Sequence, residues 1–462
     1  MIRLFKHYIP RSVLVLWGVD ILLLYAADSS GFSIRYAMLG KAFPSLAERW
    51  PESLTFILTI YVAMFALGLY RREACRDVKV SFVRLLLVFV LSFPLLSIVF
   101  FVYPAVSTWR SIFLISFALA FVGLFAARIA FSRLVDVNVL KQKVLVLGGG
   151  PRARRVRQLE QDGLTHEFRV VGFVRMSVEG TEFPDAPLCS ELGSLADYAR
   201  QNNVDEIVTA MEERRGALPV EALLECKLRG FRITDFTTFL ERETGQVELD
   251  SLNPSWLIYS DGFAGGRRDM LVKRSFDITA SLGLLIFSLP VLLVTMVAIK
   301  LTSRGPIFYR QERVGQYGKS FMLLKFRSMR VDAETEGTPQ WAKHNDPRIT
   351  SIGQILRVTR IDEFPQIFNV LKGDMSFVGP RPERFYFVEQ LAREIPYYPE
   401  RHYVKPGITG WAQINYPYGA SIEDAKCKLQ YDLYYVKNCT LFMDILIMIQ
   451  TARVILFTEG GR

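Results

Sequence analysis

The feature that most constrains the fold of this chain is a series of four long apolar segments near its start. These segments are Val13–Ala27, Leu54–Tyr70, Val80–Val102 and Ile112–Phe131. A helix needs about 20 mostly apolar residues to cross a membrane, so they predict a transmembrane domain of four helices over residues 1–135. Half of the 462 residues are apolar, which excludes an intrinsically disordered chain because there is ample apolar surface to bury.

Basic residues predict the orientation of these helices, because short loops rich in Lys and Arg stay in the cytoplasm. They precede the first segment, fill the loop after the second and follow the fourth: Arg3, Lys6, Arg11, Arg71, Arg72, Arg76, Lys79, Arg128, Arg133, Lys141 and Lys143. The N-terminus and the chain after Phe131 are therefore expected to be cytoplasmic. Asp20, inside the first segment, is either functional or hydrogen-bonded between helices, and we favour the structural interpretation.

A second domain is predicted over residues 143–250, where strand and helix patterns alternate as in a small Rossmann-like parallel sheet. Strands are expected at the start of Lys143–Leu159 and at Phe168–Val174, Val204–Ala210 and Phe231–Phe236. The turn Gly148–Gly150 could hold phosphate at a helix N-terminus. However, the GxGxxG spacing is absent, and Arg175 stands where an NAD site has an acidic residue. We therefore favour a structural or regulatory module over a redox site.

A further apolar segment, Ile278–Ile299, carries no formal charge but is flanked by basic residues on both sides. The positive-inside rule therefore places both of its ends in the cytoplasm. Pro290 in its middle removes one helix hydrogen bond, and Ser288 can bond to a freed backbone carbonyl. We predict a bent, re-entrant membrane helix over about 276–301, with a proline-kinked fifth span as the alternative.

The last part of the chain is rich in charged residues, glycine and proline. Asp362 and Glu363 are adjacent carboxylates with Arg357 and Arg381 nearby in the sequence. Mg²⁺ takes one or two carboxylates together with substrate phosphates and waters, and arginines bind phosphate through paired hydrogen bonds. A carboxylate can also attack phosphorus as a nucleophile. In isolation, such a pair is more typical of solvated carboxylates bonded to neighbouring arginines.

Five ordered motifs in this part resemble those of the bacterial polyprenyl-phosphate hexose-1-phosphate transferases. They are the Ser-Leu-Pro bend, GPIFYRQERVGQYGKSF, KFRSM, LRVTRIDEFPQIFNVLKGDMSFVGPRP and PGITGWAQIN. The resemblance implies an α+β catalytic domain over residues 267–462. The four spans and the Rossmann-like domain resemble the large members of this family. The ending INYPYGASIEDAKCKLQYDLYYVKN resembles the exosortase-associated exopolysaccharide subgroup.

The resemblance implies that hexose-1-phosphate passes from a UDP-hexose to undecaprenyl phosphate, releasing UMP, as the first membrane step of exopolysaccharide synthesis. Asp362 falls on the family's nucleophile and Mg²⁺ ligand, and Glu363 on the carboxylate that supports the metal site or proton handling. Lys325 falls on a further active-site position. The expected phosphate-binding or substrate-binding residues are Arg357, Arg360, Arg381, Trp411 and Gln413. Trp411 is equally suited to stacking on substrate and to anchoring at the membrane interface.

The expected partners are the UDP-hexose, undecaprenyl phosphate and membrane lipids, and the net charge of +10 suits such anionic partners. Nucleic acid is not expected, and a homodimer is left open. The expected location is the bacterial inner membrane, with a cytoplasmic catalytic domain. Leu441–Phe457 is predicted to be an amphipathic helix lying on the membrane, with a final span as the alternative.

Two rival functions remain at this point. A non-catalytic scaffold or regulator of polysaccharide assembly would be expected to have lost the carboxylate pair, which is present. A membrane-anchored sugar-nucleotide oxidoreductase would need the glycine turn to bind a dinucleotide, and the broken fingerprint disfavours it.

Overall fold

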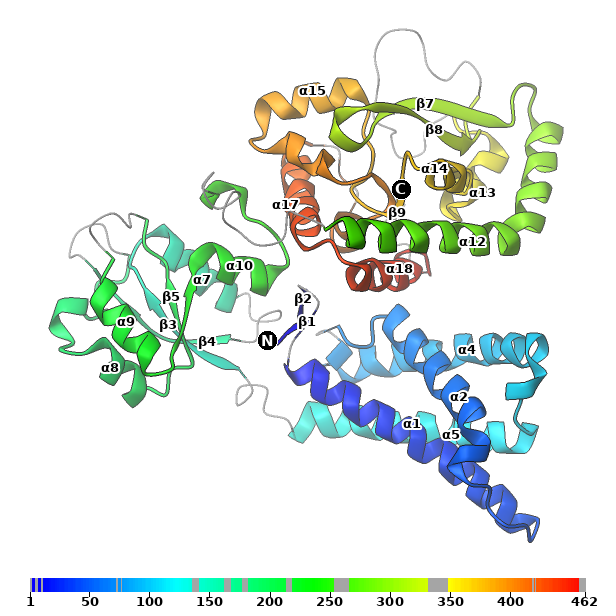
Figure 1. Ribbon diagram of the computed structural model, residues 1–462, viewed down its shortest axis with the longest axis horizontal. Coiled ribbons are helices and arrows are strands. Elements are labelled where there is room, and N and C mark those ends of the chain that lie inside the picture. The colour runs from blue at the N-terminus through cyan, green and yellow to red at the C-terminus, as the bar shows by residue number, and fades with distance from the viewer. Residues whose placement is uncertain are drawn as a thin grey trace. The chain divides into compact units, whose positions relative to one another are not determined.

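The protein is described by a computed structural model, shown in Figure 1. The described residues are 2–4, 7–9, 11–71, 74–75, 77–134, 141–161, 168–176, 182–212, 218–252, 266–330, 348–417, 419 and 421–456. They form two compact units, the first mostly from Tyr8–Thr244 and the second mostly from Gly245–Arg462. At the start of the chain, the short strands β1 (Ile2–Leu4) and β2 (His7–Ile9) pair with each other.

The first part of the first unit is a helical bundle. Its helices are α1 (Arg11–Met38), α2 (Leu46–Ala66), α4 (Val78–Val102) and α5 (Arg110–Leu134), with the short turn η1 (Pro104–Val106) before α5. Helix α1 packs against α5 and α2, and α4 packs against α2 and α5. Asp20 accepts a 2.7 Å hydrogen bond from Arg128, and both side chains are buried. Asp20 therefore joins α1 to α5, which confirms its structural interpretation.

Among the described residues, four helices are long and apolar enough to cross a membrane. They contain Val13–Met38, Val78–Val102, Arg110–Arg133 and Arg268–Thr302. The set differs from the predicted one at two places. Helix α2 is present in the bundle but is not one of these four candidate spans, because it ends at Ala66 and its first turns carry Glu48, Arg49 and Glu52. The fourth helix is instead the segment that the sequence predicts to re-enter the membrane.

The second part of the first unit is a parallel sheet in the order β4-β3-β5-β6. Its strands are β3 (Gln142–Leu147), β4 (Phe168–Val174), β5 (Glu206–Thr209) and β6 (Arg232–Asp235). The helices are α7 (Pro151–Gln161), α8 (Leu195–Gln201), α9 (Val220–Leu228) and α10 (Phe236–Thr244), with the turn η2 (Cys189–Glu191). Side chains alternate along β3 between two hydrophobic clusters, one with α7 and α10 and one with α8 and α9. Both faces are thus covered, as the near-continuous apolar strands require.

The second unit combines two small sheets with helices. Strands β7 (Phe308–Val314) and β8 (Ser320–Phe326) form an antiparallel hairpin, and β9 (Ser376–Val378) pairs in parallel with β10 (Gly407–Thr409). The helices are α12 (Arg267–Thr302), α13 (Ser351–Val358), α14 (Gln366–Lys372), α15 (Phe385–Glu394), α16 (Trp411–Asn415), α17 (Ile422–Asn438) and α18 (Leu441–Leu456). Short turns are η3 (Leu249–Ser251), η4 (Gln316–Gly318), η5 (Ile361–Glu363) and η6 (Tyr398–Tyr403).

Helix α12 bends sharply into two arms in Figure 1, and Pro290 lies inside it. The Ser288 hydroxyl donates to the Leu285 carbonyl at 3.5 Å. The second arm packs Leu292 and Ile299 into a hydrophobic cluster with α13 and β8. The first arm is held by polar contacts, because Lys273 forms a 2.5 Å ion pair with Asp444 of α18. The bend predicted from Ser288 and Pro290 is therefore present in the helix.

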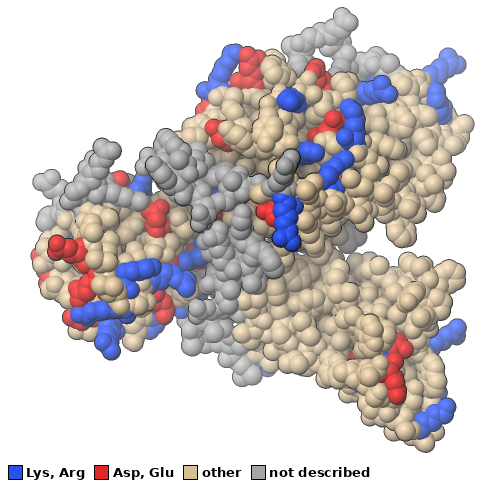
Figure 2. Space-filling view, in the orientation of Figure 1, with Lys and Arg blue, Asp and Glu red and all other residues tan. Residues whose placement is uncertain are grey.

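The surface of α12 around this bend is apolar and exposed. Ile286 is 70% exposed and Phe287 is 83% exposed, and Figure 2 shows an uncharged surface over this part of the helix. Helix α18 has its polar side chains on the inside instead, because Asp444 binds Lys273 and Arg453 donates to the Ile414 carbonyl. Apolar side chains are thus left on the outside of α12 while the charges of α18 point into the domain.

Candidate active site

The carboxylate pair lies in the tight turn η5 between α13 and α14. Arg360, the residue directly before this turn, has a left-handed backbone, at a φ of 60°. A non-glycine residue in this conformation costs of order 1 kcal/mol or more, so the surrounding contacts must hold it. The turn buries both carboxylates, leaving Asp362 7% and Glu363 8% exposed.

One oxygen of Glu363 is bonded to two cations. Its Oε1 accepts hydrogen bonds from Lys325 of β8 and from Arg381, both at 2.8 Å. Burial opposes ionisation, but the charges of Arg381 and Lys325 hold the pKa of Glu363 far below its usual range. Glu363 is therefore a fixed negative charge that keeps two side chains in place.

Asp362 is in the opposite situation. Burial, reinforced by the neighbouring charge of Glu363, raises the pKa of Asp362. Among the residues that the structure describes, none hydrogen-bonds to its Oδ1 atom, which is buried. Such an atom carries a desolvation cost that a ligand can relieve. Of two adjacent carboxylates, one is bonded within the protein and the other has an oxygen available for chemistry.

Asp362 lines a cavity of about 340 Å³ whose walls are strongly basic. The basic lining residues are Arg313, Lys325, Arg327, Arg330, Arg348, Arg357, Arg381, Arg384, Arg401 and Lys428. Aromatic side chains, among them Tyr309 and Tyr398, line the same space. A cavity with this composition suits a ligand that carries several negative charges beside a flat ring.

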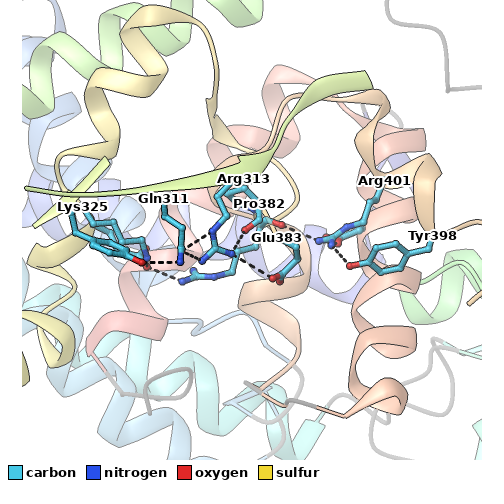
Figure 3. A network of polar contacts seen from close by, with 11 residues as sticks. Gln311, Arg313, Lys325, Pro382, Glu383, Tyr398 and Arg401 are labelled. Carbon is cyan, nitrogen blue, oxygen red and sulfur yellow. Dashed lines mark hydrogen bonds and ion pairs between the residues drawn. The ribbon is translucent and has the colours of Figure 1, made fainter. Parts of the chain in front are cut away.

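A row of polar contacts runs along this cavity in Figure 3. Arg313 donates to Gln311 Oε1 at 2.5 Å and to the Pro382 carbonyl at 3.0 Å. Arg401 is buried and donates to Asp432 and to the Tyr398 hydroxyl, each at 2.7 Å. The motif that contains Gln311 gave this residue no role, and no motif singled out Tyr398 or Arg401. The contact between Arg401 and Asp432 joins η6 to α17, which only the fold brings together.

The predicted arginines do not all line the same cavity. Arg357 lines the basic cavity and donates to the Ser328 hydroxyl at 3.0 Å. Arg360 lines a second cavity together with Glu363, and Arg381 lines both cavities. Gln413 also lines the second cavity, and its amide donates to the Ile408 carbonyl at 3.3 Å.

Trp411 does not line either of these cavities. Its ring is 8% exposed, and its indole N–H donates to the Gly245 carbonyl at 2.9 Å. The ring also stacks on Tyr434 with centroids 5.8 Å apart. The structure therefore shows packing contacts for Trp411, and its contact with substrate or with the membrane interface stays a prediction.

The expected Mg²⁺ would be held at the carboxylate pair. Within the described ranges, no group of three or more Asp, Glu, His or Cys side chains is placed to bind a metal. The Asp362 oxygen without a partner is a suitable ligand, whereas Glu363 Oε1 is already occupied by Lys325 and Arg381. Mg²⁺ often relies on one carboxylate with substrate phosphates and waters. The residues fit a metal ion bound by Asp362 and a phosphorylated ligand together.

At the glycine turn of the parallel-sheet domain, a side chain of the protein lies beside the N-terminus of the helix. Glu212 accepts a 3.0 Å hydrogen bond from the backbone N–H of Arg152, at the N-terminus of α7. A side chain at Gly150 would place its Cβ 2.6 Å from the Glu212 carboxylate. Gly148, with a φ of 138°, lies directly against the Ala210 carbonyl. The position that a phosphate would take at this helix is thus filled by the protein's own carboxylate.

Comparison with known proteins decides the family. Residues 268–458 match the family model described as bacterial sugar transferase. Undecaprenyl-phosphate galactose phosphotransferase of Salmonella typhimurium is 30% identical over 370 residues, which cover 76% of this chain and 75% of that protein. The chain belongs to the bacterial sugar transferase family. The matched segment of this sugar transferase contains the carboxylate pair and both cavities.

Two further relatives of this sugar transferase cover smaller parts. UDP-N-acetylgalactosamine-undecaprenyl-phosphate N-acetylgalactosaminephosphotransferase of Aeromonas hydrophila is 42% identical over 243 residues, covering 52% of this chain. The aligned part spans 56% of that relative's length. The exopolysaccharide production protein PSS of Rhizobium leguminosarum is 43% identical over 192 residues, covering 40% of this chain and 94% of the relative.

Residues 65–224 match a second family model, described as a CoA-binding domain. The glycine turn does not fit a phosphate of such a ligand, because the Glu212 carboxylate already accepts the N–H of Arg152. A phosphate bound at this turn would be repelled by the negative charge of the Glu212 carboxylate. The oxidoreductase alternative depended on a dinucleotide at this same turn, so the geometry also disfavours it.

Proposed function

We propose that this sugar transferase moves hexose-1-phosphate from a UDP-hexose to undecaprenyl phosphate and releases UMP. The observation that carries the proposal is that Asp362 lines a basic cavity and keeps a buried oxygen without a partner among the described residues. The names of the relatives support the two substrate classes, and the Rhizobium relative supports a place in exopolysaccharide synthesis.

The proposed reaction has two displacements at one phosphorus atom. Asp362 Oδ1 attacks the phosphorus that carries the hexose, and the bond from this phosphorus to the bridging oxygen breaks, so that UMP leaves with the electron pair. The product is a hexose phosphate bonded to Asp362. A phosphate oxygen of undecaprenyl phosphate then attacks the same phosphorus, which restores the carboxylate and forms the diphosphate link.

The surrounding residues stabilise charge rather than exchange protons. Phosphoryl transfer relies mainly on positioning and on electrostatic stabilisation of the phosphate oxygens. Lys325 and Arg381 are fixed by Glu363 within 2.8 Å hydrogen bonds, and Arg357 lines the same cavity as Asp362. Mg²⁺, when bound by Asp362 and the diphosphate, would neutralise further negative charge.

We also propose that α12 enters the inner membrane from the cytoplasmic side and returns. Its bend and the exposure of Ile286 and Phe287 support this placement, because such side chains are stable in lipid. The catalytic unit would then be cytoplasmic, with its site near the lipid headgroups. A membrane-bound acceptor and a water-soluble donor could both reach it there.

The test is the identity of the released nucleotide. The purified protein, in lipid nanodiscs with Mg²⁺ and undecaprenyl phosphate, is given a panel of UDP-hexoses. Release of UMP with one donor is the expected result, because the sugar leaves with its phosphate. Release of UDP would mean that the sugar moves alone, and the proposed chemistry at Asp362 would be excluded.

A further inference from the structure

A second cavity, of about 310 Å³, adjoins the same carboxylate pair. Asp362 lines the basic cavity and Glu363 lines the second one. Four residues line both spaces: Arg381, Glu383, Arg401 and Lys428. The two cavities therefore share a polar boundary, and the carboxylate pair contributes one side chain to each.

The walls of the second cavity differ in chemistry from those of the first. Away from the shared boundary they are mostly hydrocarbon: Leu284, Phe364, Ile367, Phe377, Ile408, Ala412, Ile414, Met448 and Val454. A hexose or a nucleotide would leave its hydroxyl groups against these side chains without hydrogen bonds, at a substantial cost. A hydrocarbon chain with a phosphate at one end matches both the apolar walls and the basic boundary.

Two elements connect this cavity with the apolar surface of the domain. Met448 and Val454 belong to α18, and Leu284 belongs to α12. Leu284 lines the cavity and is also 37% exposed, and it is followed by Ile286 and Phe287, which are 70% and 83% exposed. The apolar lining thus continues into the apolar exterior of α12, so a lipid chain could pass between them without leaving a hydrocarbon environment.

We propose that the second cavity binds the phosphate end and the first isoprene units of the polyprenyl phosphate acceptor. This inference rests on the proposed function. The acceptor phosphate lies at Arg360 and Arg381, and the chain runs past α18 and leaves beside Leu284. From there, a phosphate oxygen reaches the phosphorus held on Asp362 across the shared boundary. Its attack forms the diphosphate bond, breaks the bond to Asp362 Oδ1 and needs no other reactant.

The experiment fills the hydrocarbon part of the cavity without touching the reacting groups. Met448→Trp adds bulk inside the cavity, and Ile445→Trp adds the same bulk on the exposed side of the same helix. Each protein is assayed in nanodiscs for the UMP released in a first turnover without acceptor, and for steady-state turnover with undecaprenyl phosphate. For Met448→Trp we expect an unchanged first turnover and a kcat/KM for undecaprenyl phosphate lowered by roughly tenfold or more. Ile445→Trp should match the wild type in both assays.

Two outcomes would overturn the assignment while the proposed function stands. Equal losses of first turnover and acceptor kcat/KM would make the cavity part of the donor site. Unchanged values in both would place the acceptor elsewhere. A wild type without any first-turnover UMP would instead contradict the two-step reaction.

A binding readout that needs no activity separates these cases. A short prenyl phosphate carrying a benzophenone should crosslink to peptides of α18 in the full-length protein. Undecaprenyl phosphate should compete with this labelling, and UMP should not. Labelling confined to peptides outside the cavity would also contradict the assignment.

Discussion

The two predicted phosphate sites of this protein differ in whether a side chain of the protein already occupies the position of the anion. At the glycine turn of the parallel-sheet domain, Glu212 accepts the N–H of Arg152, so the chain supplies its own anion. At the carboxylate pair of the second unit, Asp362 keeps a buried oxygen without a partner among the described residues, and a basic cavity lies next to it. A motif therefore indicates where an anion can bind, but the position is available to a ligand only where no side chain of the protein already fills it.

The largest effect should come from Asp362→Asn. The amide keeps the shape of the side chain but cannot act as a nucleophile on phosphorus, so turnover should fall by at least about 10³-fold. UMP release in nanodiscs measures it. Asp374→Asn is a matched control and should retain activity, because Asp374 lines neither cavity and pairs with the exposed Lys372. Wild-type turnover in the Asp362→Asn variant would mean that Asp362 is not the nucleophile, and the difference between the two sites would have no consequence for activity.

The next effect is expected at Arg401, a cation of the cavity whose charge is already paired. Its ion pair with Asp432 spans 2.7 Å with both side chains buried. Arg401→Met would leave the Asp432 carboxylate buried without its partner, and should lower the free energy of unfolding by about 3 kcal/mol or more.

The control for this prediction is Arg393→Met, which removes an exposed ion pair with Glu389 and should cost well under about 1 kcal/mol. Chemical denaturation in detergent measures both variants. Adding Asp432→Leu to Arg401→Met should recover much of the loss. Equal stabilities of Arg401→Met and Arg393→Met would mean that the buried pair contributes no more than a surface pair.

A smaller effect is predicted at the glycine turn. Glu212→Ala removes the carboxylate at the N-terminus of α7 and should cost about 1 kcal/mol of stability. UMP release should be unchanged, because Glu212 lies outside the catalytic unit. The wild-type protein should show no CoA binding by calorimetry, and the variant should gain weak phosphate binding. Tight CoA binding to the wild type would contradict the account of this turn.

The smallest effect concerns pH. Burial and the adjacent Arg401 lower the pKa of His402 to about 4. The folded protein thus keeps His402 neutral where the unfolded chain takes up a proton, so stability should fall as the pH drops from about 6.5 to about 4. At pH 6 the loss should be at most about 1 kcal/mol, and His402→Gln should remove that part of the pH profile. An identical profile in the variant would assign the dependence to other groups.

The sequence predicted those features that depend on residues close together along the chain. The bend of α12, which contains Pro290, and the parallel sheet follow from local patterns. Asp20 was assigned a structural role without its partner Arg128 being known. The different states of Asp362 and Glu363 could not be predicted, because they depend on Lys325 and Arg381, which the fold brings from other elements.

Two further features were outside the reach of local patterns. Trp411 was equally compatible with substrate and interface, and only the fold shows its N–H bonded to the Gly245 carbonyl. The apolar run that begins at Leu54 predicts a span, and the structure places most of it in helix α2, which starts at Leu46 with charged residues and ends at Ala66. In both cases the outcome depends on contacts or helix ends that the run of apolar or aromatic residues does not specify.

In the proposed reaction, Asp362 carries the hexose phosphate between the two displacements. The most direct measurement is mass spectrometry of peptides from the protein quenched with acid after incubation with its UDP-hexose and Mg²⁺ but no acceptor. The peptide containing Asp362 is expected to gain the mass of one hexose phosphate and to lose it when undecaprenyl phosphate is added. An unmodified Asp362 peptide in a sample that has released one UMP per protein molecule would contradict the proposed reaction.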